Sequence, residues 1–175
     1  MKKINVFFLM CFSMWSFAQV QWMTLEEALN SNATTPKKIL INFYTSDCEA
    51  CDRMNTMTYD HPDIAKLINE HFYAVKFNVE EKNKFRAFGR EFQNKEMSLN
   101  SKGYHEFSKY LNVVSAPTIV FLDEKLSLIT KLQGFFSPKE LDPFLSGIAN
   151  NKHQKITTKE QWLLYQKKFK SKIKE

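Results

Sequence analysis

Residues 38–51 of the chain read Lys-Ile-Leu-Ile-Asn-Phe-Tyr-Thr-Ser-Asp-Cys-Glu-Ala-Cys, an apolar run that leads into a pair of cysteines. The β-branched and aromatic residues over 38–44 predict a strand that is buried on both faces, as in an α/β sheet. Residues 48–56 predict a helix directly after that strand. Cys48 would then occupy the helix start, where unpaired amides and the helix dipole stabilise a thiolate, with Cys51 one turn further on. This arrangement favours reversible thiol–disulfide exchange.

The cysteine pair has two other interpretations. It could be a passive structural disulfide, or it could carry a soft metal ion such as Cu(I). A zinc site would need two further ligands, and the four histidines of the chain show no paired metal-binding spacing. We therefore expect a redox pair with no resident metal and no bound cofactor, and we keep copper binding and a passive disulfide as alternatives.

The surrounding sequence predicts alternating helices and strands. Thr24 and Glu27 have the spacing of a capping box, which predicts a short helix to about residue 32. A helix over residues 62–72 and a strand over 73–79 complete a parallel β-α-β unit with the strand over 38–44. The helical stretches 48–56 and 62–72 are expected to form one kinked or broken helix. The later predicted elements are strands 118–123 and 126–133, joined by a tight turn at 124–125, and a helix behind Ser137 that runs to about residue 148.

Residues 80–103 are polar and precede a helix predicted over 104–111. Phe85, Phe88 and Phe92 recur within this segment at helical spacing, which predicts a weak helix over 84–92 that packs these rings on the core. Asn and Ser are frequent over 93–103, which is typical of a loop.

The amino terminus has the pattern of an export signal over residues 1–18. Two lysines precede an apolar run that ends in small residues suited to a signal peptidase, so we predict cleavage before Gln19 and a periplasmic or secreted protein. The run is short for a membrane span, so a retained membrane anchor is the weaker alternative. Lipidation at Cys11 is a second weaker alternative. The mature chain then keeps two cysteines, too few for a framework of structural disulfides.

The net charge of +6 is concentrated in residues 151–175, which hold eight lysines and two glutamates. We divide the mature chain into one domain over residues 19–150 and a basic helical extension over 151–175. The domain has no glycine-rich phosphate loop and no arginine cluster, so we expect no nucleic-acid partner. A capping-box spacing over residues 157–160 predicts a helix whose Trp162, Tyr165 and Phe169 pack on the chain's own domain, with membrane contact as the less favoured alternative.

Residues 41–51, together with Ala116-Pro117-Thr118-Ile119-Val120-Phe121 and the later Gly134, resemble the thioredoxin family. The resemblance extends over about residues 22–148 and rests on two separated motifs in the right order. It implies an α/β fold of the thioredoxin-like type, a three-layer sandwich in which helices flank a central mixed β-sheet. Residues 80–103 would be an insertion, because the family's usual connection is shorter there. This insertion either covers the edge of the active site or has no role.

The resemblance also implies roles for particular residues. Cys48 would be the attacking thiolate, and Cys51 would be the resolving thiol that releases the mixed disulfide. Pro117 would be the family's cis-proline, which faces the cysteines and leaves the backbone of Ala116, with its neighbour Ser115, free to bind an extended substrate. The implied activity is dithiol–disulfide exchange with protein or peptide substrates and with a redox partner.

Four residues depart from the family's pattern or modify its chemistry. Asn42 stands where thioredoxins carry a buried aspartate, and an amide cannot transfer a proton during exchange. Asp47 replaces the tryptophan that commonly precedes the first cysteine, and Glu49 and Asp52 add two more acids around the pair. Negative charge disfavours a nearby thiolate, so these acids would oppose the helix dipole unless they point into solvent.

Overall fold

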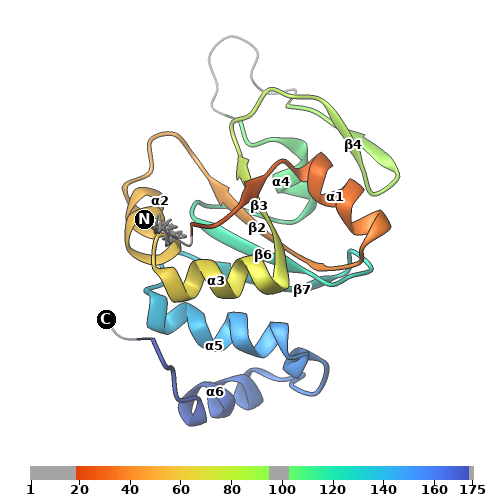
Figure 1. Ribbon diagram of the computed structural model, residues 1–175. Helices are drawn as coiled ribbons and strands as arrows, with labels where there is room; N and C mark the ends of the chain where they lie inside the picture. Colours follow the sequence, from red (N-terminus) through yellow and green to blue (C-terminus); the bar gives the residue numbers. More distant parts are fainter. Residues whose placement is uncertain (1–18, 95–102, 174–175) are drawn as a thin grey trace, which may run out of the picture.

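The computed structural model describes residues 19–94 and 103–173 (Figure 1). The predicted signal peptide, which includes Cys11, lies outside the described residues, so the predicted cleavage site is described only from Gln19 onwards. Residues 95–102 of the predicted loop also lie outside the described residues. None of the helices in the described part of the chain is long and apolar enough to cross a membrane.

A five-stranded mixed sheet forms the centre of the fold, in the strand order β1-β3-β2-β6-β7. The strands are β1 Trp22–Met23, β2 Lys38–Tyr44, β3 Phe72–Asn78, β6 Thr118–Leu122 and β7 Leu128–Gln133. β1, β2 and β3 are parallel, whereas β6 runs antiparallel to β2 and β7 antiparallel to β6. β2 lies in the middle and is buried up to its last residue, which explains why its sequence is a continuous apolar run.

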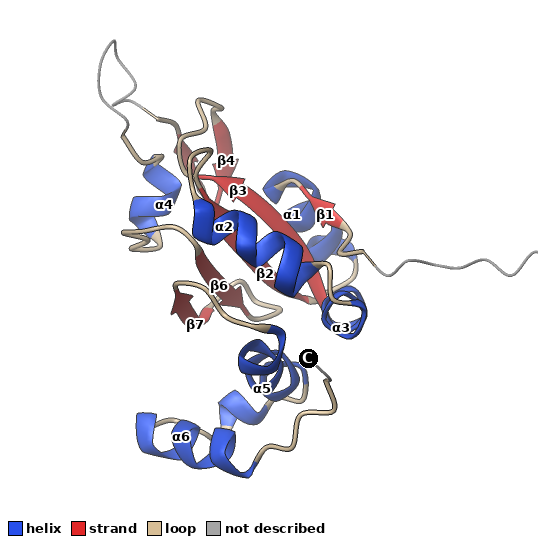
Figure 2. Cartoon of the chain, turned by 90° about the vertical axis from the view of Figure 1, so that its left-hand side faces the viewer, coloured by secondary structure: helices blue, strands red, loops and turns tan. Residues whose placement is uncertain are grey.

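Helices cover both faces of this sheet (Figures 1 and 2). One face packs on α3 (Pro62–His71) and α5 (Pro138–Ala149), with Leu40, Ile68 and Leu145 in the same buried cluster. The opposite face packs on α1 (Leu25–Thr34) and α4 (Glu106–Tyr110). The three-layer sandwich with a central mixed sheet is therefore confirmed.

The helix that follows β2 is broken, as predicted. It starts as α2 (Glu49–Arg53) and continues as a π-helical segment, η1 (Met54–Tyr59), in which the Asp60 N–H donates to the Asn55 carbonyl. The chain then leaves helical conformation at His61, with ψ at 124°. The Nδ1 atom of His61 accepts the Asp63 N–H at 3.2 Å and Pro62 takes the first helical position, so α3 begins as a separate helix.

The predicted helix over residues 84–92 is wrong. This segment is a β-hairpin of β4 (Phe85–Ala87) and β5 (Arg90–Phe92), joined by Phe88 and Gly89. Both turn residues have positive φ, 52° and 71°, which is the conformation of a type I′ hairpin turn. The rings still pack on the core: those of Phe85 and Phe92 lie 5.5 and 5.3 Å from the ring of Phe107.

The connection between β6 and β7 is longer than the predicted two-residue turn. It takes residues 123–127, and Leu126 has a positive φ of 65°. The Asp123 carboxylate accepts the N–H groups of Lys125 and Ser127 at 2.9 and 2.7 Å. An aspartate that binds amides of its own loop stabilises a turn of this kind, so β7 begins two residues later than predicted.

The carboxyl-terminal helix α6 (Lys159–Lys168) lies outside α5, on the side away from the sheet (Figures 1 and 2). Its capping box uses Thr158 and Gln161, one residue later than predicted. The Trp162 ring lies 5.6 Å from the Phe144 ring of α5. This contact confirms that the aromatic face of the helix packs on the chain's own domain.

Candidate redox site

Cys48 lies at the start of α2, as the sequence predicted. It is the N-cap residue, with extended backbone dihedrals (φ −136°, ψ 92°), and its Sγ accepts the Cys51 N–H at 3.1 Å. The two cysteines form a disulfide, with their Cα atoms 5.1 Å apart. Cys48 is half-buried, whereas Cys51 is only 3% exposed. The more accessible sulfur is therefore the one that lies among the unpaired amides of the helix start.

This position suits the role of attacking thiol that was predicted for Cys48, and that role stays a prediction. When the disulfide is reduced, the amides and the dipole of the helix start stabilise negative charge on its sulfur. Cys51 is covered by protein but lies within bonding reach of Cys48, because the two already form a disulfide. The pair can thus open towards a substrate at one sulfur and close again at the other.

The loop before β6 reaches the same end of the sheet as the cysteine pair. In the antiparallel register Thr118 lies opposite Phe43, so Pro117 stands beside the end of β2 that leads into Cys48. The Ala116–Pro117 peptide bond is cis, as predicted.

Hydrogen bonds on both sides fix this loop. The Thr118 Oγ1 donates to the Ser115 carbonyl at 2.7 Å, and the Gly134 N–H donates to the Pro117 carbonyl at 2.8 Å. Pro117 is buried, whereas Ser115 and Ala116 are half-buried. The substrate-binding roles of Ser115 and Ala116 and the catalytic role of Pro117 stay predictions.

Asn42 faces the layer that contains η1, α3 and α5, since it shares the Leu40 side of β2. It is 2% exposed, and its Oδ1 has no hydrogen-bond partner among the described residues. Its neighbour on β3 is Lys76, whose ammonium lies over the rings of Trp22 at 5.9 Å and Tyr44 at 5.2 Å. This face of the sheet therefore carries a positive charge but no carboxylate at position 42.

The three predicted acids around the pair, Asp47, Glu49 and Asp52, are all exposed. Glu49 and Asp52 lie in the first turn of α2, where the helix dipole favours negative charge. Solvent screens the repulsion between exposed charges, so the effect of these acids on Cys48 is weak in this arrangement. Their modulating role stays a prediction.

Two more acids at this edge were missed by the sequence analysis. The Glu80 carboxylate accepts the Ser46 N–H at 3.4 Å, so the segment after β3 contacts the segment that leads into Cys48. Burial, together with the negative charge of Glu81, raises the pKa of Tyr44 at the end of β2. The carboxyl ends of parallel strands meet at one edge of a sheet, and this rule could have placed both acids here.

The sequence analysis also missed the contacts between the redox helix and the loop that follows β7. The Arg53 guanidinium lies over the Phe135 ring at 4.6 Å. The Thr58 hydroxyl donates to the Phe136 carbonyl at 2.6 Å. Because Gly134 donates to Pro117, this one loop joins the redox helix to the predicted substrate loop.

The described part of the chain has no cluster of His, Cys, Asp and Glu side chains around the cysteine pair that could hold a metal ion. In residues 19–94 and 103–173, no group of three or more His, Cys, Asp and Glu side chains could hold a metal ion.

A mixed sheet of this order, with a disulfide at the start of the helix after its central strand, defines a thioredoxin-like protein. Residues 25–149 match the family described as thioredoxin-like domain. Since the match covers most of the chain, the chain belongs to this family. With the Cys48–Cys51 pair in place, its class is that of the thiol–disulfide oxidoreductases.

Solved structures with the same fold are distant in sequence. A thioredoxin from Thermus thermophilus is 20% identical with a TM-score of 0.56, covering 74% of this chain and 87% of its own. A thioredoxin-fold protein from Helicobacter pylori is 22% identical with a TM-score of 0.56, covering 86% and 87%. The DsbH oxidoreductase is 20% identical with a TM-score of 0.52, covering 79% and 86%. No curated protein is similar enough in sequence to count as a relative.

Proposed function

We propose that this protein exchanges disulfides with protein or peptide substrates after export to the periplasm or to the outside of the cell. The observation that carries the proposal is the unequal accessibility of Cys48 and Cys51 at a helix start. A passive disulfide does not need a solvent-accessible cysteine at a helix start. A pair that exchanges disulfides needs one accessible cysteine that can attack a substrate. The export signal expected over residues 1–18 supports the compartment.

The proposed reaction, written as a reduction, has two steps. The Cys48 thiolate attacks one sulfur of a substrate disulfide, forms a mixed disulfide and releases the other substrate sulfur as a thiolate. Cys51, after losing its proton to solvent, attacks the Cys48 sulfur and releases the second substrate thiolate. The protein loses two electrons and the substrate gains them, so a separate thiol partner must reduce the Cys48–Cys51 disulfide again. Oxidation of a substrate follows the same steps in reverse.

The loop formed by Ser115, Ala116 and Pro117 supplies the proposed substrate surface. It is held rigidly by its bonds to Thr118 and Gly134, and its first two residues are partly exposed. An extended peptide can pair its backbone with such a loop, and main-chain pairing accepts many different side chains. This surface suits protein or peptide substrates better than one small molecule.

A trapping experiment tests the proposal. The Cys51→Ser variant should stall at the mixed disulfide, because no resolving thiol is left, and it should accumulate a covalent adduct with a disulfide-bonded test peptide. The Cys48→Ser variant is the matched control and should form no adduct. Equal adduct formation by both variants, or none by Cys51→Ser, would contradict the proposed roles.

The proposed location is tested separately by expressing the full chain and a chain that lacks residues 1–18. The full chain should be recovered from the exported fraction with its first residues removed before Gln19. If both chains stay in the cytoplasmic fraction, the export part of the proposal fails while the exchange activity is unaffected.

A further inference from the structure

The inner face of helix α6 packs on helix α5 of its own domain. The Trp162 and Tyr165 rings lie over Gly147 of α5, where an added Cβ would meet them at 3.1–3.3 Å. The Trp162 ring also packs on Phe144, and the Tyr165 ring lies 5.7 Å from that of Phe169. The aromatic side chains therefore hold α6 against α5 and are half-buried there.

The outer face of α6 presents two neighbouring leucines. Leu163 is 55% exposed and Leu164 is 52% exposed. Residues four apart share one side of a helix, so Lys159 and Lys167 flank Leu163 and Lys168 follows Leu164. All three lysines are exposed, and in the part of the chain that the structure describes no ion pair engages them.

One acid shares this face, because Glu160 precedes Leu164 by four residues, so the outer face carries three lysines against one glutamate. Glu160 lies in the first turn of α6, where hydrogen bonds from its own backbone N–H and from Thr158 lower its pKa. Its charge therefore complements the helix start. Within residues 151–173, the part of this segment that the structure describes, four further lysines are exposed, namely Lys152, Lys155, Lys170 and Lys172.

We propose that the outer face of α6, formed by Lys159, Leu163, Leu164, Lys167 and Lys168, binds the surface of an anionic lipid bilayer. A surface helix with exposed leucines and lysines can lie in the interface with its leucines among the lipid headgroups, while flanking lysines extend towards lipid phosphates. The charge of the surface and that of the lipid are complementary. The domain side of α6 stays packed on α5, so binding needs no unfolding.

A lipid surface fits these observations better than an acidic protein does. A specific protein interface buries about 800 Å² on each partner around a closely packed apolar core, and two leucines supply little of it. Lysines attract an anionic bilayer additively, at about fivefold in affinity for each one near the surface, without needing a complementary shape. The separated lysines and the small apolar patch therefore suit binding to an anionic bilayer better than binding to a protein.

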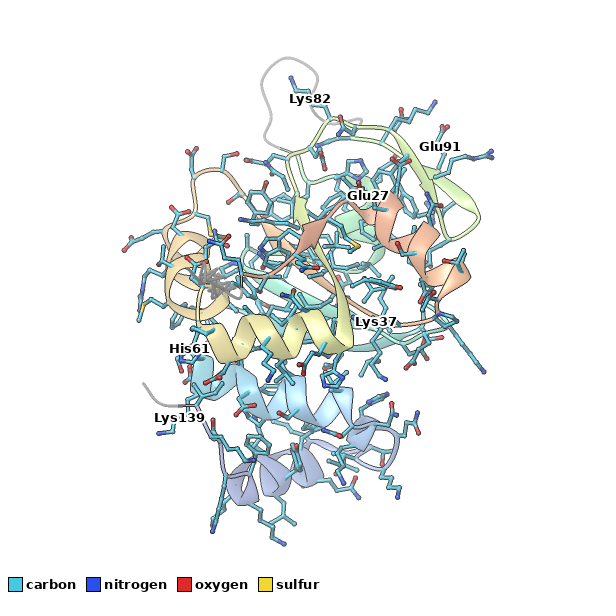
Figure 3. The ribbon with its side chains drawn as sticks, in the orientation of Figure 1. Glu27, Lys37, His61, Lys82, Glu91 and Lys139 are labelled. Carbon is cyan, nitrogen blue, oxygen red and sulfur yellow. A yellow bond between two sulfur atoms is a disulfide. The ribbon has the colours of Figure 1, made fainter. Side chains whose placement is uncertain are left out.

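Vesicle binding tests this proposal directly. The full chain is used in every arm, so that any contribution of residues 1–18 is common to all of them, and binding to anionic phosphatidylglycerol vesicles is compared with binding to neutral phosphatidylcholine vesicles. The triple change Lys159→Gln, Lys167→Gln and Lys168→Gln should weaken anionic binding by about a hundredfold. The control triple change Lys82→Gln, Arg86→Gln and Arg90→Gln removes the same charge around the β4–β5 hairpin, at the opposite end of the molecule from α6 (Figures 1 and 3). It should leave binding within about threefold of that of the unchanged protein.

The leucines are tested in the same assay. Leu163→Ser with Leu164→Ser should weaken anionic binding by about tenfold or more, whereas Leu128→Ser, which changes an exposed leucine on β7, should not. Disulfide exchange activity should be unchanged in all variants, which shows that they are folded. Equal binding to both kinds of vesicle, or equal losses in the two triple variants, would overturn the proposal. Stronger binding to polyglutamate than to vesicles, insensitive to the leucine changes, would assign the face to an acidic polypeptide instead.

Discussion

After β2 and after β3 the chain leaves the sheet at the same edge, and these two exits differ in what they expose and what they bury. After β2 the chain is partly or fully exposed and ends at the half-buried Cys48. After β3 it runs into the β4–β5 hairpin and to His105, whose side chain is completely buried. The first exit presents a reactive cysteine to solvent, whereas the second keeps lysines such as Lys82 at the surface and buries the imidazole of His105 (Figure 3).

His105 shows how the second exit satisfies its polar groups. Its Nδ1 accepts the Phe107 N–H at 3.1 Å and so caps α4, which assigns the ring proton to Nε2. The Nε2–H then donates to the Asn83 carbonyl at 2.8 Å, and the ring stacks on Phe85 at 5.1 Å between centroids. The exit after β3 therefore stabilises the fold, whereas the exit after β2 carries the proposed reactive cysteine. Substitutions at the two exits should accordingly change stability and exchange activity separately.

The largest expected effect is on activity at the first exit. Cys48→Ser should lower the rate of disulfide exchange by at least about a thousandfold, to the uncatalysed background, because a hydroxyl cannot replace the thiolate. In reducing buffer its free energy of unfolding should stay within about 0.5 kcal/mol of the parent, since serine also caps a helix. Enzymatic peptide reduction and denaturant unfolding check the two parts, and retained activity would remove the cysteine from the mechanism.

The opposite pattern is expected at the second exit. His105→Leu leaves the Phe107 N–H buried without a partner and removes the bond to the Asn83 carbonyl, and it should lower the free energy of unfolding by about 2–4 kcal/mol. The rate of exchange by the folded protein should change less than about twofold. His105→Asn is the matched variant: it keeps a capping acceptor for α4 and should recover part of the stability. A loss of activity without a loss of stability would show that the two exits are coupled.

The sequence predicted the first exit well, because its signals are local. A continuous apolar run specifies β2, and the start of the next helix follows at Cys48, so the unequal exposure of the two cysteines needs no distant information. The motif around Pro117 was equally readable. The three acids are exposed, and their effect on Cys48 stays a prediction.

The second exit was predicted poorly, because its signals conflict. Phe85, Phe88 and Phe92 have helical spacing, and the same spacing serves a hairpin whose turn falls at Phe88 and Gly89. Phenylalanine rarely adopts positive φ, so only Gly89 marked the turn. Contacts between remote segments, such as Arg53 on Phe135, depend on the assembled fold and leave no periodic pattern in the sequence.

A smaller effect is expected at Asn42, the position of β2 where thioredoxins carry a buried aspartate. Asn42→Asp would bury an acid at a position that is 2% exposed, which should cost about 1–3 kcal/mol of unfolding free energy at neutral pH. Burial would raise the pKa of the new carboxyl above its unfolded value, so the folded state binds the proton more tightly. The destabilisation should therefore shrink as the pH falls towards about 4, the ordinary aspartate range.

The matched control at this position is Asn42→Leu. It removes an amide whose Oδ1 has no partner, and it should leave stability unchanged or increase it at every pH. Denaturant unfolding of both variants at several pH values measures the difference. A pH-independent loss in Asn42→Asp would instead mean that Lys76, its neighbour on β3, fully compensates the new charge.

The smallest expected effect concerns the acids that surround the first exit. Neutralising Asp47, Glu49 and Asp52 to their amides should lower the pKa of Cys48 in the reduced protein, because negative charge nearby raises the cost of a thiolate. The shift should be modest, since all three carboxylates are exposed and solvent screens them. It should also shrink in high salt, which a purely structural consequence of the substitutions would not do. Ultraviolet absorbance of the thiolate measures the pKa directly, whereas the exchange rate does not, because a lower pKa gives more thiolate but a weaker nucleophile. No downward shift even at low salt would mean that the helix start alone sets the charge state of Cys48.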